Sequence, residues 1–171
     1  MATMKRPIRE IPNPQVLDAA KQFREGFLLM IAQPPCSGVL LPALHCASIA
    51  LELYLKSCSA HEIEVPDSAF PGASYIYAES QARSHKLEDL FDQAPSYLRD
   101  VIEKGLEGMP RLYRFSSVRD ALEAHNGVFM ASRYPFEPTS DLGAVEMEAL
   151  SELLQLLESS LRGASHQWIK A

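Results

Sequence analysis

The chain has 171 residues, of which 47% are hydrophobic and 22% are charged, so it has the composition and length of one folded globular domain. Its formal net charge of −6 gives no overall attraction to a phosphate backbone, and a nucleic-acid role would need a local basic patch. The main basic clusters are Arg111, Arg114 and Arg119, and Lys5, Arg6 and Arg9.

The cysteines and the N-terminus indicate a cytoplasmic protein without membrane association. Cys36, Cys46 and Cys58 cannot all pair within one chain, and none lies in a Cys-x-x-Cys motif. The first 13 residues lack the apolar core of a secretory signal and are expected to form a loose tail. The most apolar stretch, residues 38–55, carries His45 and Glu52, which favours a buried helix over a membrane span.

Two strong helices are predicted first along the chain. Residues 13–33 combine a capping Asn13 with Pro14 at the first helical position, and apolar residues recur at 16, 20, 23, 27 and 31. Residues 39–59 are apolar almost all round, which indicates a central helix. We expect its core residues to be nearly fully buried: Leu44, Ala47, Leu51 and Leu55.

The few polar residues of the central helix share one narrow stripe. His45, Ser48, Glu52 and Lys56 follow at helical spacings, and Glu52 and Lys56 form an i,i+4 pair in the favourable order. The stripe is either a solvated edge or a polar wall facing a groove.

The next segment, residues 61–83, breaks the helical pattern at Pro66, Pro71 and Gly72. Within it "ASYIYA" has strand character, but no second strand is evident. We interpret the segment as a long ordered loop that could contain a small hairpin.

Four more helices complete an expected all-α bundle of five to six helices with one irregular insertion. They are residues 84–93, capped by Ser84 or His85; residues 94–108; residues 116–134, with a serine cap and Pro135 as the stop; and residues 139–162. Residues 163–171 are expected to be a loose tail. The last helix should bury an inner stripe of leucines: Leu150, Leu153, Leu154, Leu157 and Leu161.

Three motifs follow one another along the chain: Glu-Leu-x-Leu-Lys, His-x-Leu-x-x-Leu and an aromatic-x-x-x-Arg-Tyr helix. They fall on Glu52, Leu53, Leu55 and Lys56; on His85, Leu87 and Leu90; and on Phe129, Arg133, Tyr134 and Glu137. With these motifs the chain resembles bacterial HEPN-like helical proteins over roughly residues 14–162. The resemblance implies a HEPN-like helical bundle that forms a homodimer, works with a partner protein, and serves in bacterial defence or stress response.

HEPN-type ribonucleases carry an Arg-x(4–6)-His pair that cleaves RNA without metal across a homodimer. The resemblance places this pair on Arg119 and His125. Residues six apart lie about 120° apart around a continuous helix. His125 therefore falls on the apolar face with Val118, Leu122 and Phe129, which favours a core residue over a catalyst. Asn126 and Gly127 could loosen the helix and bring the pair together.

These patterns lead to two functional hypotheses. The first is a non-catalytic HEPN-type module for protein interaction or for binding a nucleotide or RNA. Its candidate binding residues are Glu52, Lys56, His85, Lys86, Arg133 and Tyr134. A ring nitrogen of His85 can bond a backbone group or Glu52, so His85 is either a scaffold residue or part of a pocket with Lys56 and Lys86. A buried Arg133 needs a carboxylate, for which Glu137 and Glu52 are the candidates. The alternative is a metal-independent, toxin-like endoribonuclease using Arg119 and His125.

No metal or cofactor is expected. Cys58 and His61 have a Cys-x-x-His spacing, but no second pair follows at zinc-finger distance. The chain also has no P-loop and no Gly-x-Gly-x-x-Gly motif.

Overall fold

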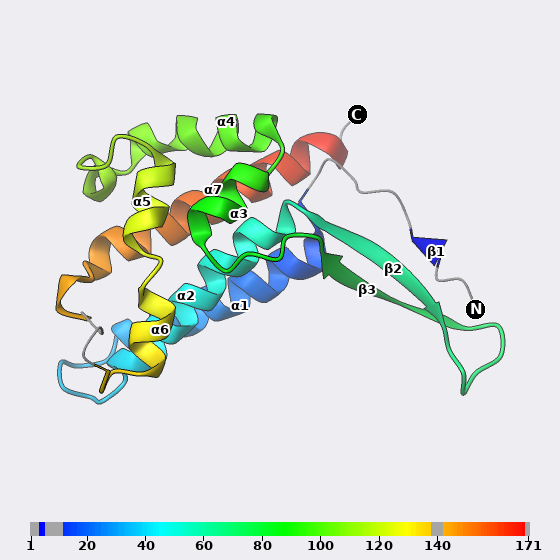
Figure 1. Cartoon of the computed structure of the whole chain (residues 1–171), viewed down its shortest axis with the longest axis horizontal. Helices are drawn as coiled ribbons and strands as arrows, with labels where there is room; N and C mark the ends of the chain where they lie inside the picture. The colour runs from blue at the N-terminus through cyan, green and yellow to red at the C-terminus, as the bar shows by residue number, and fades with distance from the viewer. Residues whose placement is uncertain (1–3, 6–11, 138–141, 170–171) are drawn as a thin grey trace.

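The computed structural model of the chain describes residues 4–5, 12–137 and 142–169. It is mainly helical, as expected, and it also contains a small antiparallel sheet that the all-α prediction lacked (Figure 1). In chain order the elements are β1 (Met4–Lys5), α1 (Pro14–Ile31), α2 (Leu40–Ser57), β2 (Ala60–Pro66), β3 (Ser74–Ser80), α3 (Leu87–Gln93), α4 (Ser96–Gly105), α5 (Val118–Ala124), α6 (Val128–Arg133) and α7 (Met147–Ile169). Single turns of 3₁₀ helix lie at Leu106–Gly108, Pro110–Leu112 and Leu142–Ala144.

The start of α1 confirms the predicted cap. The Oδ1 atom of Asn13 accepts hydrogen bonds from the backbone N–H groups of Gln15 (3.0 Å) and Val16 (3.2 Å), and Pro14 is the first helical residue. The expected apolar face is only partly right. Ala20 and Phe27 are fully buried, but Phe23 and Ile31 are exposed, because the buried face is centred nearer to Leu17.

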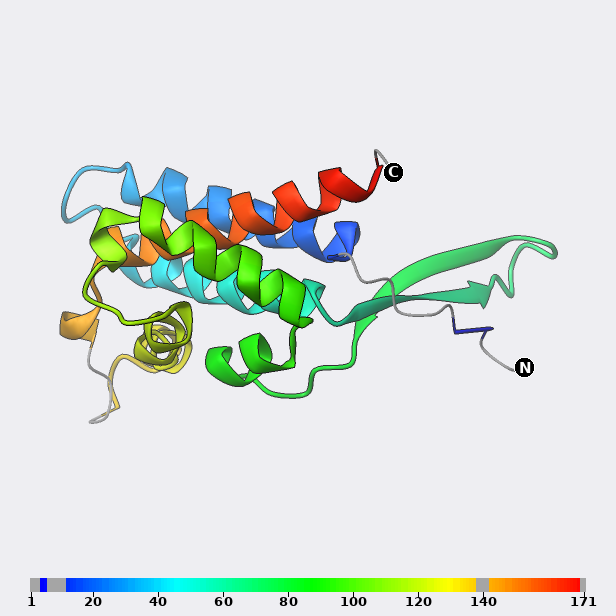
Figure 2. The same cartoon turned by 90° about the horizontal axis from the view of Figure 1, so that it is seen from above.

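The α2 helix is the centre of the fold. It packs against α1, α3, α6 and α7, and Figure 2 shows α1, α2 and α7 running side by side. The predicted core residues of α2 have exposed fractions of 0–1%: Leu44, Ala47, Leu51 and Leu55. The predicted inner stripe of the last helix is also fully buried, so both central predictions are confirmed.

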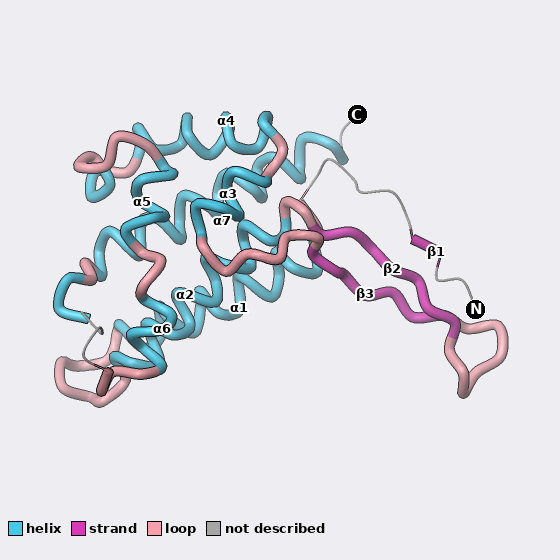
Figure 3. Tube along the Cα trace, viewed as in Figure 1, coloured by secondary structure: helices cyan, strands magenta, loops and turns pink. Residues whose placement is uncertain are grey.

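The sheet has the order β1-β2-β3 and is antiparallel throughout. The interpretation of residues 61–83 as a long loop without a second strand is therefore wrong, and the small hairpin that it allowed is present. Strand β2 pairs with β3 from Ala60↔Ser80 to Pro66↔Ser74. On the other edge of β2, Met4 pairs with Glu64 and Lys5 with Ile63, so these two residues form a strand rather than a loose tail. Figure 3 shows the hairpin extending away from the helices.

Several helix boundaries differ from the prediction. The single helix expected over residues 116–134 is broken at His125, Asn126 and Gly127 into α5 and α6. The last helix, expected over residues 139–162, begins at Met147 and continues to Ile169; residues 142–144 form a separate 3₁₀ turn, and residues 139–141 lie outside the described residues. The predicted cap of α3 is also wrong: α3 begins after Lys86, and its Leu87 N–H donates to Asn126 Oδ1 at 2.7 Å.

No helix within the described ranges combines the length and the apolar character needed to cross a membrane.

Candidate functional site

A cavity of about 720 Å³ lies between α2, the segment before α3, and α6. We call it the α2–α6 groove. Its apolar lining comprises Ile49, Leu53, Phe129 and Met130, and its polar lining comprises His45, Glu52, His85, Lys86, Asn126 and Arg133. Four of the six predicted binding residues therefore line one cavity, although they come from three separate parts of the chain. Two residues of the polar stripe of α2, His45 and Glu52, line the groove, whereas Ser48 is buried and Lys56 lies outside the lining.

Glu52 is the centre of the polar network in the groove. Its Oε1 atom lies 2.6 Å from Lys56 Nζ and 3.0 Å from His85 Nδ1, so the expected contact between His85 and Glu52 is present. The Glu52 side chain is only 20% exposed, whereas the His85 ring is 80% exposed. Lys56 does not line the groove, and it contacts the groove residue Glu52 from outside the lining.

Lys86 and Arg133 are the two cations that line the groove. Within the described part of the chain, neither has a carboxylate at ion-pair distance. The expected burial of Arg133 against Glu137 or Glu52 is wrong, because Arg133 is exposed. Its guanidinium lies 5.3 Å from the ring centre of Tyr134, which caps α6 and is absent from the groove lining.

An aromatic platform forms one part of the groove. The rings of His45 and Phe129 are stacked, with centroids 5.1 Å apart and planes inclined by 26°. The Nδ1 atom of His45 is buried and has no hydrogen-bond partner in the described structure. The platform therefore offers a planar apolar surface on one side of the groove.

Asn126 holds two walls of the groove together. Its Oδ1 accepts from the backbone N–H of Leu87, and its Nδ2 donates to the carboxylate of Glu88. These bonds tie the N-terminus of α3, which follows Lys86, to the break before α6. This role of Asn126 could not be predicted from the sequence, because its partners lie 39 and 38 residues away. The stack of His45 on Phe129 was missed for the same reason.

The proposed catalytic pair has a different environment. His125 is 3% exposed, and its Nδ1–H donates to the carbonyl of Ala121 at 2.7 Å. Burial lowers the pKa of His125, so its neutral form is favoured. Arg119 is on the surface and contacts Asp92 (3.2 Å) and Glu123 (3.3 Å). The break at Asn126 does not bring Arg119 to His125 in a hydrogen bond or ring contact.

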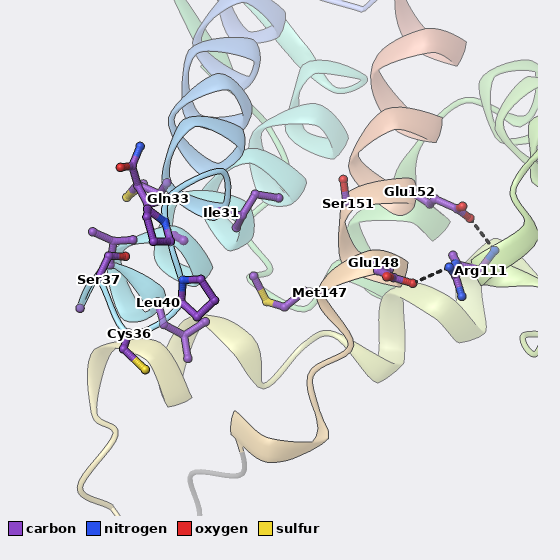
Figure 4. Close-up of a pocket in the computed structure, with 16 residues that line it drawn as sticks. Ile31, Gln33, Cys36, Ser37, Leu40, Arg111, Met147, Glu148, Ser151 and Glu152 are labelled. Carbon is purple, nitrogen blue, oxygen red and sulfur yellow. Dashed lines mark hydrogen bonds and ion pairs between the residues drawn. The ribbon is translucent and has the colours of Figure 1, made fainter.

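Figure 4 shows a second cavity, of about 860 Å³, between the α1–α2 loop and the start of α7. Its lining is largely apolar, and it also carries Cys36 and Arg111. Arg111 is already occupied: its guanidinium lies 2.9 Å from Glu148, and its backbone N–H donates to Glu152 at 2.7 Å. This cavity therefore lacks the unpaired cations of the α2–α6 groove.

Among the described residues, no group of three or more His, Cys, Asp or Glu side chains is placed to hold a metal ion. Comparisons of the chain with protein-family models, with curated proteins and with solved structures each found no match.

Proposed function

We propose that this chain is a non-catalytic HEPN-type helical module that binds a nucleotide, either free or as part of RNA, in the α2–α6 groove. The observation that supports this proposal is the position of two cations without carboxylate partners, Lys86 and Arg133, around a cavity that contains the His45–Phe129 platform. The HEPN resemblance supports the family assignment.

The chemistry of the groove matches the parts of a nucleotide. A phosphate group is recognised by charge-assisted hydrogen bonds, and arginine gives two parallel ones. A base stacks on an aromatic side chain, and Phe129 with His45 provides that surface. Glu52, whose charge is offset by Lys56, can accept a hydrogen bond from a ribose hydroxyl.

A homodimer in the cytoplasm, with a role in bacterial defence or stress response alongside a partner protein, belongs to the same proposal. It rests on the family resemblance and, for the compartment, on the three cysteines, which are all unpaired.

The alternative function is a metal-independent endoribonuclease that uses Arg119 and His125. In that mechanism His125 would relay a proton from the ribose 2′-OH, and Arg119 would stabilise charge on the phosphate. The buried, backbone-bonded ring of His125 and the two carboxylates around Arg119 favour the binding module instead.

Titration with ATP tests the proposal, with amide chemical shifts and calorimetry as the measurements. We expect shifts at the groove residues and not at the second cavity. Lys86→Gln and Arg133→Gln should each weaken binding by about tenfold or more, because a hydrogen bond to a charged group contributes roughly 1.5–3 kcal/mol.

The matched control is Arg111→Gln, which removes a surface arginine from the second cavity and should leave the ATP affinity unchanged. If all three variants bind ATP equally well, or if the parent protein shows no groove shifts at millimolar ATP, the proposed function is wrong.

A further inference from the structure

The β2–β3 hairpin is a second candidate for recognition, separate from the α2–α6 groove. It extends beyond the helical body (Figure 3), and its root is anchored by buried residues that include Ala60 and Ile63. Towards the turn, the side chains become exposed, with Phe70 at 67%. The hairpin is thus fixed at one end and open to solvent at the other.

The outer edge of β3 is free among the described strands, because the sheet order is β1-β2-β3. Edge strands present unpaired backbone N–H and C=O groups, and natural proteins protect them with lysine, proline or a bulge. Ser74–Ser80 contains no lysine and no proline, and its register with β2 is continuous over all seven pairs. The edge is therefore able to accept another strand.

An apolar face adjoins this edge. Partners across an antiparallel pair share a face, so Tyr75 lies with Val65 and Tyr77 lies with Ile63. Tyr75 and Tyr77 are 54% and 42% exposed, and their rings are 6.3 Å apart. An added strand could pack its side chains against this pair of tyrosines.

The charge of the hairpin indicates which charge a strand that docks on the β3 edge should carry. Residues 57–82 contain the four carboxylates of Glu62, Glu64, Asp67 and Glu79, and no lysine or arginine. A second copy of the hairpin would bring like charges together, whereas a basic segment would be attracted. The opposite edge of the same sheet already pairs with β1, which lies in a stretch of the chain that carries Lys5, Arg6 and Arg9.

We propose that the free edge of β3 is a docking site for an extended, lysine- or arginine-rich segment of a partner protein, which adds to the sheet as a fourth strand. Main-chain hydrogen bonds to β3 supply affinity, the tyrosine pair supplies apolar contact, and the four carboxylates select a basic sequence.

The test uses the full chain and an eight-residue peptide that alternates lysine with threonine or valine. We expect amide shifts along Ser74–Ser80, and no binding of the same peptide with glutamate in place of lysine. Ile76→Lys places a like charge beside the edge and should weaken binding by about fivefold or more. Leu29→Lys is the matched control and should bind normally, because Leu29 is exposed in the last turn of α1, and the C-terminal end of α1 lies away from the hairpin (Figure 1).

Three results would overturn the proposal. The first is the absence of shifts in β3 at millimolar peptide. The second is a set of shifts confined to Ile63 and Glu64, which would mean that the peptide only replaces β1. The third is self-association of the protein that Ile76→Lys abolishes while the peptide fails to bind, because the edge would then serve a second copy of the chain.

Discussion

The environment of a single histidine separates the two functional hypotheses. The Nδ1 proton of His125 is held by the carbonyl of Ala121, and its ring lies 6.2 Å from that of Phe115. A proton relay needs a ring nitrogen that reaches substrate, together with a pKa near the working pH. Burial instead lowers the pKa of this ring. His125 therefore has the contacts of a core residue that satisfies a helix carbonyl.

We predict that His125→Ala destabilises the protein by about 1–3 kcal/mol, because the buried carbonyl of Ala121 loses its donor. Urea unfolding at pH 7 measures the loss. Arg119→Ala is the control, and it should change stability by less than about 1 kcal/mol because its ion pairs are on the surface.

The same two variants test the ribonuclease alternative. We expect the parent protein not to cleave single-stranded RNA in EDTA. A different result would show that the chain is an enzyme: the parent protein cleaves RNA in EDTA, and a His125→Ala variant that is as stable as the parent does not.

Residue contacts could be predicted from the sequence where they depend on local spacing. The groove shows that contacts and exposures set by the tertiary fold could not. The pair Glu52–Lys56 follows from i,i+4 geometry, and the family motifs pointed to the contact of His85 with Glu52. The burial of Arg133 was predicted wrongly because it was inferred from the family motif, whereas Arg133 is the last residue of the short helix α6 and is exposed.

At the scale of elements, α3 depends on a cap that lies outside its own sequence. Ser84 seemed a natural cap, but its Oγ accepts from Lys86 N–H instead. The N–H of Leu87 is bonded by Asn126, 39 residues later. Local rules assign caps to the nearest Ser, Thr, Asp or Asn, so a tertiary cap is invisible to them.

We predict that Asn126→Ala exposes the first turn of α3 and costs about 0.5–2 kcal/mol, the usual effect of losing a cap. Hydrogen exchange should accelerate at the Leu87 amide. Ser84→Ala is the comparison, since it should accelerate exchange at Lys86 and leave Leu87 protected. Equal protection of Leu87 in the parent and in Asn126→Ala would contradict the role of Asn126 as the cap.

The hairpin was hard to predict for a physical reason. A strand is recognised by alternating polarity or by a partner with complementary pattern. Glu62 and Glu64 alternate with Ile63 and Val65, but Pro66 and a seven-residue turn separate this segment from its partner. Tight two-residue turns with Asn-Gly or Asp-Gly are the clearest hairpin signals, and the turn here has neither.

For the molecule as a whole, α2 links the core to the groove. One side of the helix packs on α1 and α7, and another carries His45 and Glu52 into the groove. The continuous apolar character of the sequence predicted this central position, since a helix that is apolar all round must be covered by several neighbours. The α2–α6 groove could not be predicted in the same way, because its shape depends on the break that separates α5 from α6.

We predict that Leu51→Ala lowers the free energy of unfolding by about 2–5 kcal/mol, the usual range for a leucine removed from a packed core. Leu51 is 0% exposed in the middle of α2, so the substitution leaves a cavity that the surrounding core cannot easily fill. Leu40→Ala is the matched control because Leu40 begins the same helix and is 54% exposed, and its loss should be well under that range. Urea melts with an unchanged m-value would show that both variants unfold from the same compact state. Equal losses for the two leucines would mean that α2 is not the helix around which the others pack, and the groove built on its polar face would then lose its rigid wall.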